Sequence, residues 1–289
     1  MGIFLKPQPK NSKSTKRGWP WLSLAWRVGA VVLVVGGLGL AWQQTETALR
    51  AYVADRVAAA DGDVNVELIN APAWMSPALT RELKATVAAG QGPTAPAVLD
   101  DAVVRLNDHS WVRTVGGVRW GADGEIEVAA EYRRPIAIVE GSDGYHLVDR
   151  EGVRLSGVYA AEQVRQLEMP LIVGVKARPA EAGRVWPGKD LAGGLALVQL
   201  LSGEPYLNQV AAVDVSRRDG RGRVQLALAT YAGGLVRWGL PPGNEYSVEP
   251  PAAQKKKWLR GVYEKRGAID AGGRVVDLFG PAIIHPRES

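Results

Sequence analysis

The fold is decided by Trp111-Val-Arg-Thr-Val-Gly-Gly-Val-Arg-Trp120, by the turn Gly121-Ala-Asp-Gly124 and by Glu125-Ile-Glu-Val-Ala-Ala-Glu-Tyr132. Both longer runs are rich in β-branched and aromatic residues, which favour strands. The Asp-Gly pair between them is typical of a tight turn that joins two antiparallel strands. The sequence therefore predicts a β-hairpin at residues 111–132.

A strand and two helices are predicted before this hairpin. Ser76 is a good helix N-cap and Pro77 suits the first helical position, so the pair begins a helix. Residues 90–96, rich in glycine and proline, break the helical pattern. The expected elements are a strand at Val64–Ile69, a helix from Pro77 to about Ala89 and a helix over about Ala97–Leu106. Together with the hairpin they define a compact strand–helix–helix–strand–strand unit at 64–134.

The last strand of the hairpin places Glu125, Glu127 and Glu131 on one face, because side chains alternate along a strand. Paired carboxylates can work as a general acid and base, but no nucleophile or enclosed pocket is predicted beside them, so we interpret this face as solvated. The chain has no cysteine, no His-Glu-x-x-His motif and no phosphate-binding loop motif. We therefore expect a protein that is not an enzyme, with no catalytic residue, metal ligand or cofactor.

An uncharged segment of 18 residues extends from Val28 to Thr45. As a helix it would be roughly 27 Å long, close to the thickness of a bilayer's hydrocarbon core. Four tryptophans, at 19, 21, 26 and 42, flank it, as is typical of membrane interfaces. The sequence predicts a transmembrane helix at 28–45 and a stalk at 46–63. A cleavable signal peptide ending near Ala41 is the alternative interpretation.

The positive charge of the chain is concentrated before this segment. Residues 1–27 carry six Lys and Arg and no Asp or Glu, whereas the other 262 residues carry 29 basic and 30 acidic side chains. By the positive-inside rule the basic tail stays in the cytoplasm and the bulk of the chain is exported. Because the body is almost neutral, we expect no nucleic-acid partner.

Short strand patterns dominate the sequence after residue 134. The strand-like runs are Ile136–Glu140, Tyr145–Asp149, Leu171–Val175, Val210–Ser216, Arg223–Ala229, Leu235–Gly239 and Val275–Leu278. Two helices are expected among them, at Leu191–Ser202 and around Trp258 and Tyr263. The overall prediction is an α+β chain: a single N-terminal transmembrane helix, the unit at 64–134, and a mostly β domain with two helices at 135–287.

Several motifs, taken in order, resemble the bacterial cell-division family FtsQ/DivIB. They are Trp111-Val-Arg-Thr-Val115, Glu131-Tyr-Arg-Arg-Pro-Ile-Ala137, Leu147-Val-Asp-Arg-Glu-Gly152, Met169-Pro-Leu-Ile-Val-Gly174, Val213-Asp-Val-Ser-Arg-Arg218 and Val236-Arg-Trp-Gly239. The resemblance extends from about Arg17 to His285. It implies that the unit at 64–134 is a POTRA domain and that a β domain follows it.

The resemblance also implies a function and partners. Members of this family are non-catalytic scaffolds in the inner membrane at the division septum, without a small-molecule substrate. They link small single-pass coiled-coil proteins, which here would resemble FtsB and FtsL, and so regulate septal peptidoglycan synthesis. An anchored POTRA protein that acts in export or outer-membrane protein assembly is the alternative, and an exported envelope enzyme is a third class.

The mode of partner binding that the resemblance implies is pairing with an exposed final strand. The matching region comprises the helix around Lys255–Lys265 and the strand Arg274–Phe279. The candidate partner-binding residues are Trp258, Tyr263, Val275, Val276, Asp277, Leu278 and Phe279. Pro281 and Pro286 follow closely, and since proline lacks an N–H, pairing beyond Phe279 is expected to be short or one-sided. Lys255–Lys257 is interpreted as the solvated start of the helix.

Overall fold

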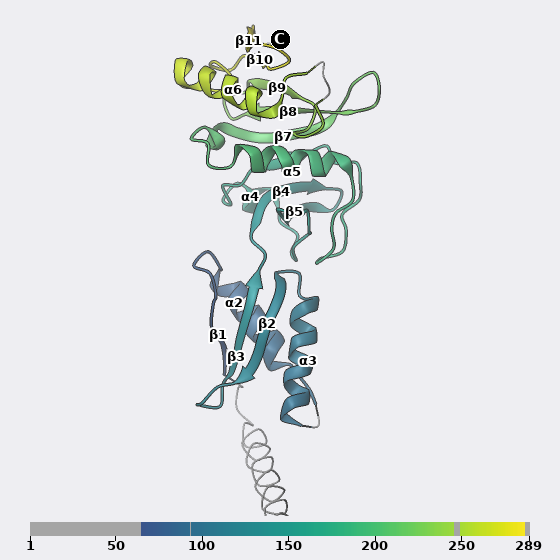
Figure 1. Cartoon of the computed structure of the whole chain (residues 1–289), viewed down its shortest axis with the longest axis vertical. Helices are drawn as coiled ribbons and strands as arrows, with labels where there is room; N and C mark the ends of the chain where they lie inside the picture. Colours follow the sequence, from purple (N-terminus) through teal and green to yellow (C-terminus); the bar gives the residue numbers. More distant parts are fainter. Residues whose placement is uncertain (1–64, 93, 246–248, 287–289) are drawn as a thin grey trace, which may run out of the picture. The chain divides into compact units, whose positions relative to one another are not determined.

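The structure is a computed structural model that describes residues 65–92, 94–245 and 249–286. The first sheet contains β1 (Val66–Leu68), β2 (Val112–Trp120) and β3 (Ile126–Tyr132) in the order β1-β3-β2. The second contains β4 (Pro135–Gly141), β5 (Gly144–Asp149), β6 (Leu171–Val173), β7 (Val210–Arg218), β8 (Val224–Thr230), β9 (Leu235–Gly239), β10 (Val275–Asp277) and β11 (Ile283–His285). Its order is β11-β10-β9-β8-β7-β6-β4-β5 (Figure 1).

The described residues form five α-helices and one 3-10 turn. They are α2 (Pro77–Ala88), α3 (Ala95–Asp108), α4 (Ala161–Val164), α5 (Lys189–Leu201), α6 (Ala252–Arg266) and the 3-10 turn η1 (Leu207–Gln209).

The first sheet and its helices follow from local signals in the sequence. Ser76 accepts a hydrogen bond from the backbone N–H of Leu79 (3.2 Å) and begins α2, and Thr94 caps α3 in the same way. Strands β2 and β3 pair antiparallel, and β1 joins β3 in parallel. The buried core of this unit contains Val66, Leu79, Leu83, Val87, Ala102, Leu106, Ile126 and Val128. The hairpin and both helices lie where the sequence predicts them.

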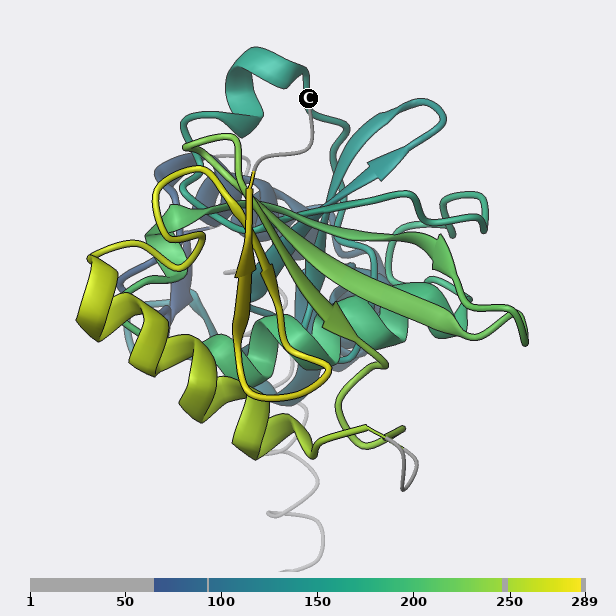
Figure 2. The same ribbon diagram turned by 90° about the horizontal axis from the view of Figure 1, so that it is seen from above.

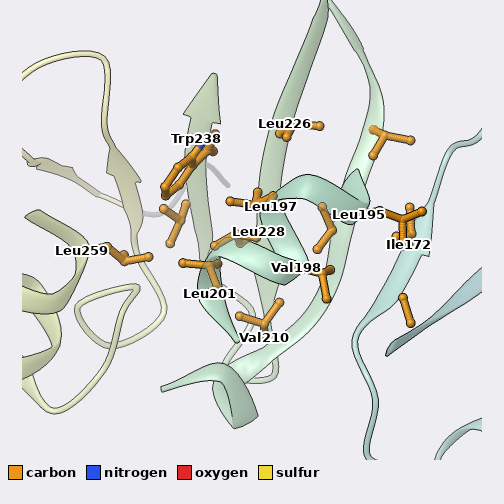
Figure 3. Packing of buried hydrophobic residues seen from close by; sticks show 14 of the residues in the cluster. Ile172, Leu195, Leu197, Val198, Leu201, Val210, Leu226, Leu228, Trp238 and Leu259 are labelled. Atoms are coloured by element: carbon orange, nitrogen blue, oxygen red, sulfur yellow. The ribbon is translucent and has the colours of Figure 1, made fainter. Parts of the chain in front are cut away.

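Two helices cover one face of the second sheet. Figure 2 shows α5 and α6 on the same side of the strands, and their side chains share one core. Figure 3 shows this core, which includes Ile172, Leu195, Val198, Leu201, Val210, Leu226, Leu228, Trp238 and Leu259. Helix α5 packs tightly on the sheet at Gly194, where an added Cβ would lie 2.9 Å from Val215 and 3.2 Å from Ile172. A larger residue there would push the helix away.

The prediction of an α+β chain with a mostly β second domain is wrong, because the chain is a mixed α/β protein. The second sheet contains the parallel pairs β4–β6, β6–β7 and β9–β10 among its antiparallel ones. Helix α5 lies between β6 and β7 in the chain, and α6 lies between β9 and β10. Parallel neighbours require such a crossover, so both helices are crossover connections of the sheet. With α4, the described residues of this region form three α-helices instead of the two predicted.

The predicted membrane helix also has no counterpart in the part of the chain that the structure describes. None of the helices in that part is long and apolar enough to cross a membrane. The basic tail at 1–27, the apolar segment at 28–45 and the stalk at 46–63 lie outside the described residues.

A buried carboxylate joins the two sheets. Asp149, at the end of β5, is fully buried and accepts a hydrogen bond from Arg133 (2.7 Å). Its other oxygen accepts the backbone N–H groups of Glu151 and Val153 (2.9 Å each). Arg133 stands directly after β3 and also bonds Glu151, which Arg113 of β2 contacts from the other side. These charges fix the position of the hairpin against the start of the second sheet.

Replacing Asp149→Asn is expected to lower the free energy of unfolding by about 3 kcal/mol, because Arg133 loses its buried counter-charge. For a chain of this size the thermal midpoint should fall by roughly 6–12 °C. Asp123→Asn, the same change at an exposed position of the β2–β3 turn, is the matched control and should leave the midpoint unchanged. Equal midpoints for the two variants in calorimetry would contradict this role for Asp149.

Candidate partner-binding site

Of the strand predicted at 274–279 only Val275–Asp277 forms, as β10, and it does not lie at the edge of the sheet. Strand β10 pairs in parallel with β9 on one side and antiparallel with β11 on the other. The chain turns back after Asp277 and adds β11, which is the outermost strand of this sheet among the described residues. The position of the edge therefore differs from the expectation by one short strand, which lies between the two prolines at 281 and 286.

Most side chains of the predicted strand are buried in the protein. Val276 and Leu278 are fully buried in the core beneath the sheet, and Val275 is 5% exposed. Asp277 is half-buried, and its carboxylate lies 3.8 Å from the guanidinium of Arg237. Phe279 alone among these five is exposed. Four of the five strand positions thus stabilise the sheet, and Phe279 is available to a partner.

The two predicted residues of α6 also pack on this core. Trp258 and Tyr263 are half-buried and touch the cluster that contains Val276. The ring of Tyr263 lies 5.5 Å from that of Tyr206, in a tilted arrangement typical of favourable aromatic pairs. The structure therefore brings all seven predicted residues to one end of the sheet, where α6 supports β10 from behind.

The backbone of β11 can bind a partner, and the hydrogen bonds of β10 show which of its groups are available. Leu235 donates to the carbonyl of Arg274 (2.9 Å), and Leu278 donates to that of Arg237 (3.1 Å). Because backbone groups alternate in direction along a strand, Val276 also faces β9. Its two neighbours in β10 then face β11.

The same alternation fixes which groups of β11 point outward. Ile283 pairs with Asp277 and His285 pairs with Val275, so the polar groups of Ile283 and His285 face β10. Those of Ala282 and Ile284 consequently point to the open edge. Pro286 is the next outward position and has no N–H. The edge thus offers two outward N–H donors, followed by a position that can only accept.

Glu204 fixes the helix that supports this edge. Its carboxylate, in the segment after α5, accepts hydrogen bonds from Arg260 (2.6 Å to one oxygen) and contacts the ammonium of Lys256 (2.9 Å). Lys256 also donates to the carbonyl of Leu200 (2.9 Å). The hydrogen bond from Arg260, with that from Lys256, holds the pKa of Glu204 below its usual value.

Lys255 fixes the first turn of α6. Its ammonium is fully buried, donates to the carbonyl of Trp238 (2.9 Å) and pairs with Glu249 (3.0 Å). Burial lowers the pKa of Lys255, and Glu249 opposes that shift. The interpretation of Lys255–Lys257 as a solvated helix start is wrong for Lys255. Its ammonium is buried and pairs with the carboxylate of Glu249, which precedes α6 in the chain.

Metal binding and acid–base catalysis both need acidic or histidine side chains that lie close together. Within residues 65–92, 94–245 and 249–286 no three His, Cys, Asp or Glu side chains gather as metal ligands would. Of the glutamates on β3, Glu127 forms an ion pair with Arg119 of β2 (2.5 Å). Glu131 is exposed, but Glu125 and Glu127 are half-buried, and Oε2 of Glu125 is buried without a hydrogen-bond partner among the described residues. The interpretation of this face as solvated therefore fits Glu131 alone.

No protein-family model matches the sequence, and no curated protein matches it either.

The ion pairs of Glu204 predict a dependence of stability on pH. A carboxyl group whose pKa is lower in the folded chain stabilises the fold above its unfolded pKa, and this contribution disappears as the pH falls through the folded value. Because Arg260 is half exposed, screening keeps the effect of Glu204→Gln to about 1–2 kcal/mol at pH 7.

Urea unfolding between pH 7 and pH 2.5 measures this difference. The gap between the unchanged chain and Glu204→Gln should start to narrow near the ordinary glutamate pKa of about 4.3, and it should close once the pH lies below the lowered pKa of the folded chain. Glu162→Gln, at an exposed position of α4, is the control and should show no gap at any pH. A gap for Glu204→Gln that persists at the lowest pH would contradict an electrostatic origin.

Proposed function

We propose that this chain is a non-catalytic scaffold of the bacterial cell-division complex. It links small single-pass coiled-coil proteins that resemble FtsB and FtsL, and in this way it regulates septal peptidoglycan synthesis. The ordered motifs that resemble FtsQ/DivIB support the proposal. The observation that carries it is the open edge of β11, which ends an eight-stranded sheet with outward donors at Ala282 and Ile284.

The edge suggests how a partner would bind. An extended segment adds to β11 as a ninth strand through backbone hydrogen bonds, and side-chain contacts supply specificity. Ile283 and Phe279, which are 55% and 47% exposed, offer apolar contacts at this end of the molecule. Helix α6 contributes indirectly, since Glu204 and Lys255 hold it against the core.

The proposal includes a location at the cytoplasmic membrane as a single-pass protein, with the described residues outside the cytoplasm at the division septum. This part rests on the sequence of residues 1–45: the basic tail and the uncharged segment after it.

Affinity purification of the full-length chain from its own dividing cells, in mild detergent, tests both the scaffold function and the location at the septum. Recovery of short single-pass coiled-coil proteins and a septal wall synthase is the expected result. Recovery of export or outer-membrane assembly components instead would overturn the proposal.

A substitution at Ile284 separates backbone pairing from side-chain contact. Ile284→Pro removes the outward N–H without removing a bond to β10, whereas Ile284→Ala removes the side chain and keeps the N–H. A donor lost from a buried pairing costs about 1–3 kcal/mol, or roughly 5- to 150-fold in affinity. We expect Ile284→Pro to lose the coiled-coil partners and Ile284→Ala to retain them in the same purification.

The two variants lose almost the same packing of residue 284 against the core, so their folds are compared first by thermal unfolding. With similar midpoints, equal recovery of the partners by both variants would exclude strand addition at this edge.

A further inference from the structure

A second feature of the molecule lies away from the edge: a cavity of about 670 Å³ with a basic lining. Four segments form it, namely the one after β6, the first turn of α5, the β7–β8 hairpin and the segment after β9. Its volume falls in the range of small-molecule sites. Its cationic side chains are Lys176, Lys189, Arg218 and Arg223.

Two of these side chains, Arg218 and Arg223, belong to a hairpin that is rich in arginine, in a protein body that is nearly neutral. The hairpin reads Ser216-Arg-Arg-Asp-Gly-Arg-Gly-Arg223, with four arginines and one aspartate in eight residues. Residues 28–289 as a whole carry 29 basic and 30 acidic side chains. The excess of positive charge at this hairpin is therefore local to it.

The carboxylates near the cavity are already used by the arginines. Asp190, which is 5% exposed, lies 3.3 Å from Arg218, and Asp219 pairs with Arg223 at 2.6 Å. Asp214, on the same hairpin, pairs with Arg217 (3.2 Å).

The two lysines have no such partner. The backbone N–H of Lys176 donates to Asp190 (3.1 Å), but its ammonium has no ion pair within the described ranges. Within those ranges the ammonium of Lys189, at the start of α5, has none either. The cavity therefore keeps about two uncompensated positive charges.

Arg218 is held in a fixed orientation beside them. Its guanidinium donates to the carbonyls of Val215 (2.6 Å) and Arg217 (2.8 Å) and to the carboxylate of Asp190. A guanidinium has five N–H donors, and these bonds use three of them. Two donors thus remain in a side chain that the protein has already oriented, which favours binding of an anion with several oxygens.

We propose that this cavity binds a phosphate group. A phosphate monoester carries a charge of about −1.5 to −2 at pH 7 and three acceptor oxygens, which match the two free ammonium groups and the remaining donors of Arg218. Ala177, Val224, Leu240 and Pro241 line the same cavity and provide an apolar wall for a carbon-bearing remainder of the ligand. The phosphate could belong to a soluble molecule or to a lipid headgroup. This inference is independent of the division scaffold and of the edge of β11.

Equilibrium dialysis of the purified full chain with radiolabelled inorganic phosphate tests the cavity at constant ionic strength. We expect saturable binding of one phosphate, and a dissociation constant raised roughly tenfold or more in the double variant Lys176→Gln with Lys189→Gln. The control is Lys257→Gln with Lys265→Gln, which removes the same charge from exposed positions of α6 and should leave the constant unchanged.

Short-chain phosphatidic acid, compared with short-chain phosphatidylcholine, distinguishes the two sources. Tighter binding of phosphatidic acid than of inorganic phosphate, lost in the cavity variant, assigns the site to a lipid headgroup. Tighter binding of inorganic phosphate assigns it to a soluble phosphate. Absence of saturable binding of both phosphate probes, or an equal loss in the cavity and control variants, would overturn the proposal. None of these results bears on the scaffold proposal, which is tested separately by purifying the partners of the full chain.

Discussion

The arrangement of the described residues depends on the buried carboxylate of Asp149. A charge without water is costly unless several donors surround it, and here Arg133 and two backbone N–H groups do so. Arg133 follows β3 directly and only one residue separates it from β4. The ion pair with Asp149 therefore lies at a very short connection between the two sheets. The motifs at 131–137 and 147–152 are two halves of this one contact, which explains in physical terms why an arginine stands at one and an aspartate at the other.

The crossover helices determine which strand ends the second sheet. Helix α5 lets β6 and β7 run parallel, and α6 does the same for β9 and β10. Since α6 must return the chain to the start of β10, its docking decides where the last strands form. Two charged contacts, at Glu204 and at Lys255, provide that docking although both involve ions that are usually exposed.

Local signals predicted the first unit well and the second less well. The caps at Ser76 and Thr94 and the turn at 121–124 act within a few residues, so the hairpin and its helices could be read from the sequence. The partner of a strand is set by distant packing, and the short apolar runs around 171 and 275 do not reveal that their neighbours run parallel. Strand β11 has only three residues and stands between prolines, which leaves no periodic pattern to detect. The burial of Lys255 depends on Glu249, six residues earlier, and nothing in the sequence pattern shows that the chain before α6 brings this carboxylate back to the first turn of the helix.

The brevity of β11 has a consequence for register. On a long edge, an added strand can slide by two residues and keep most of its hydrogen bonds, whereas a slide by one turns its side chains to the opposite face. With two outward donors and Pro286 beyond them, any slide along β11 gives up about half of the donors at once. The edge therefore accepts essentially one alignment. For the same reason it is a poor template for the open-ended stacking of copies through which long, regular edges aggregate.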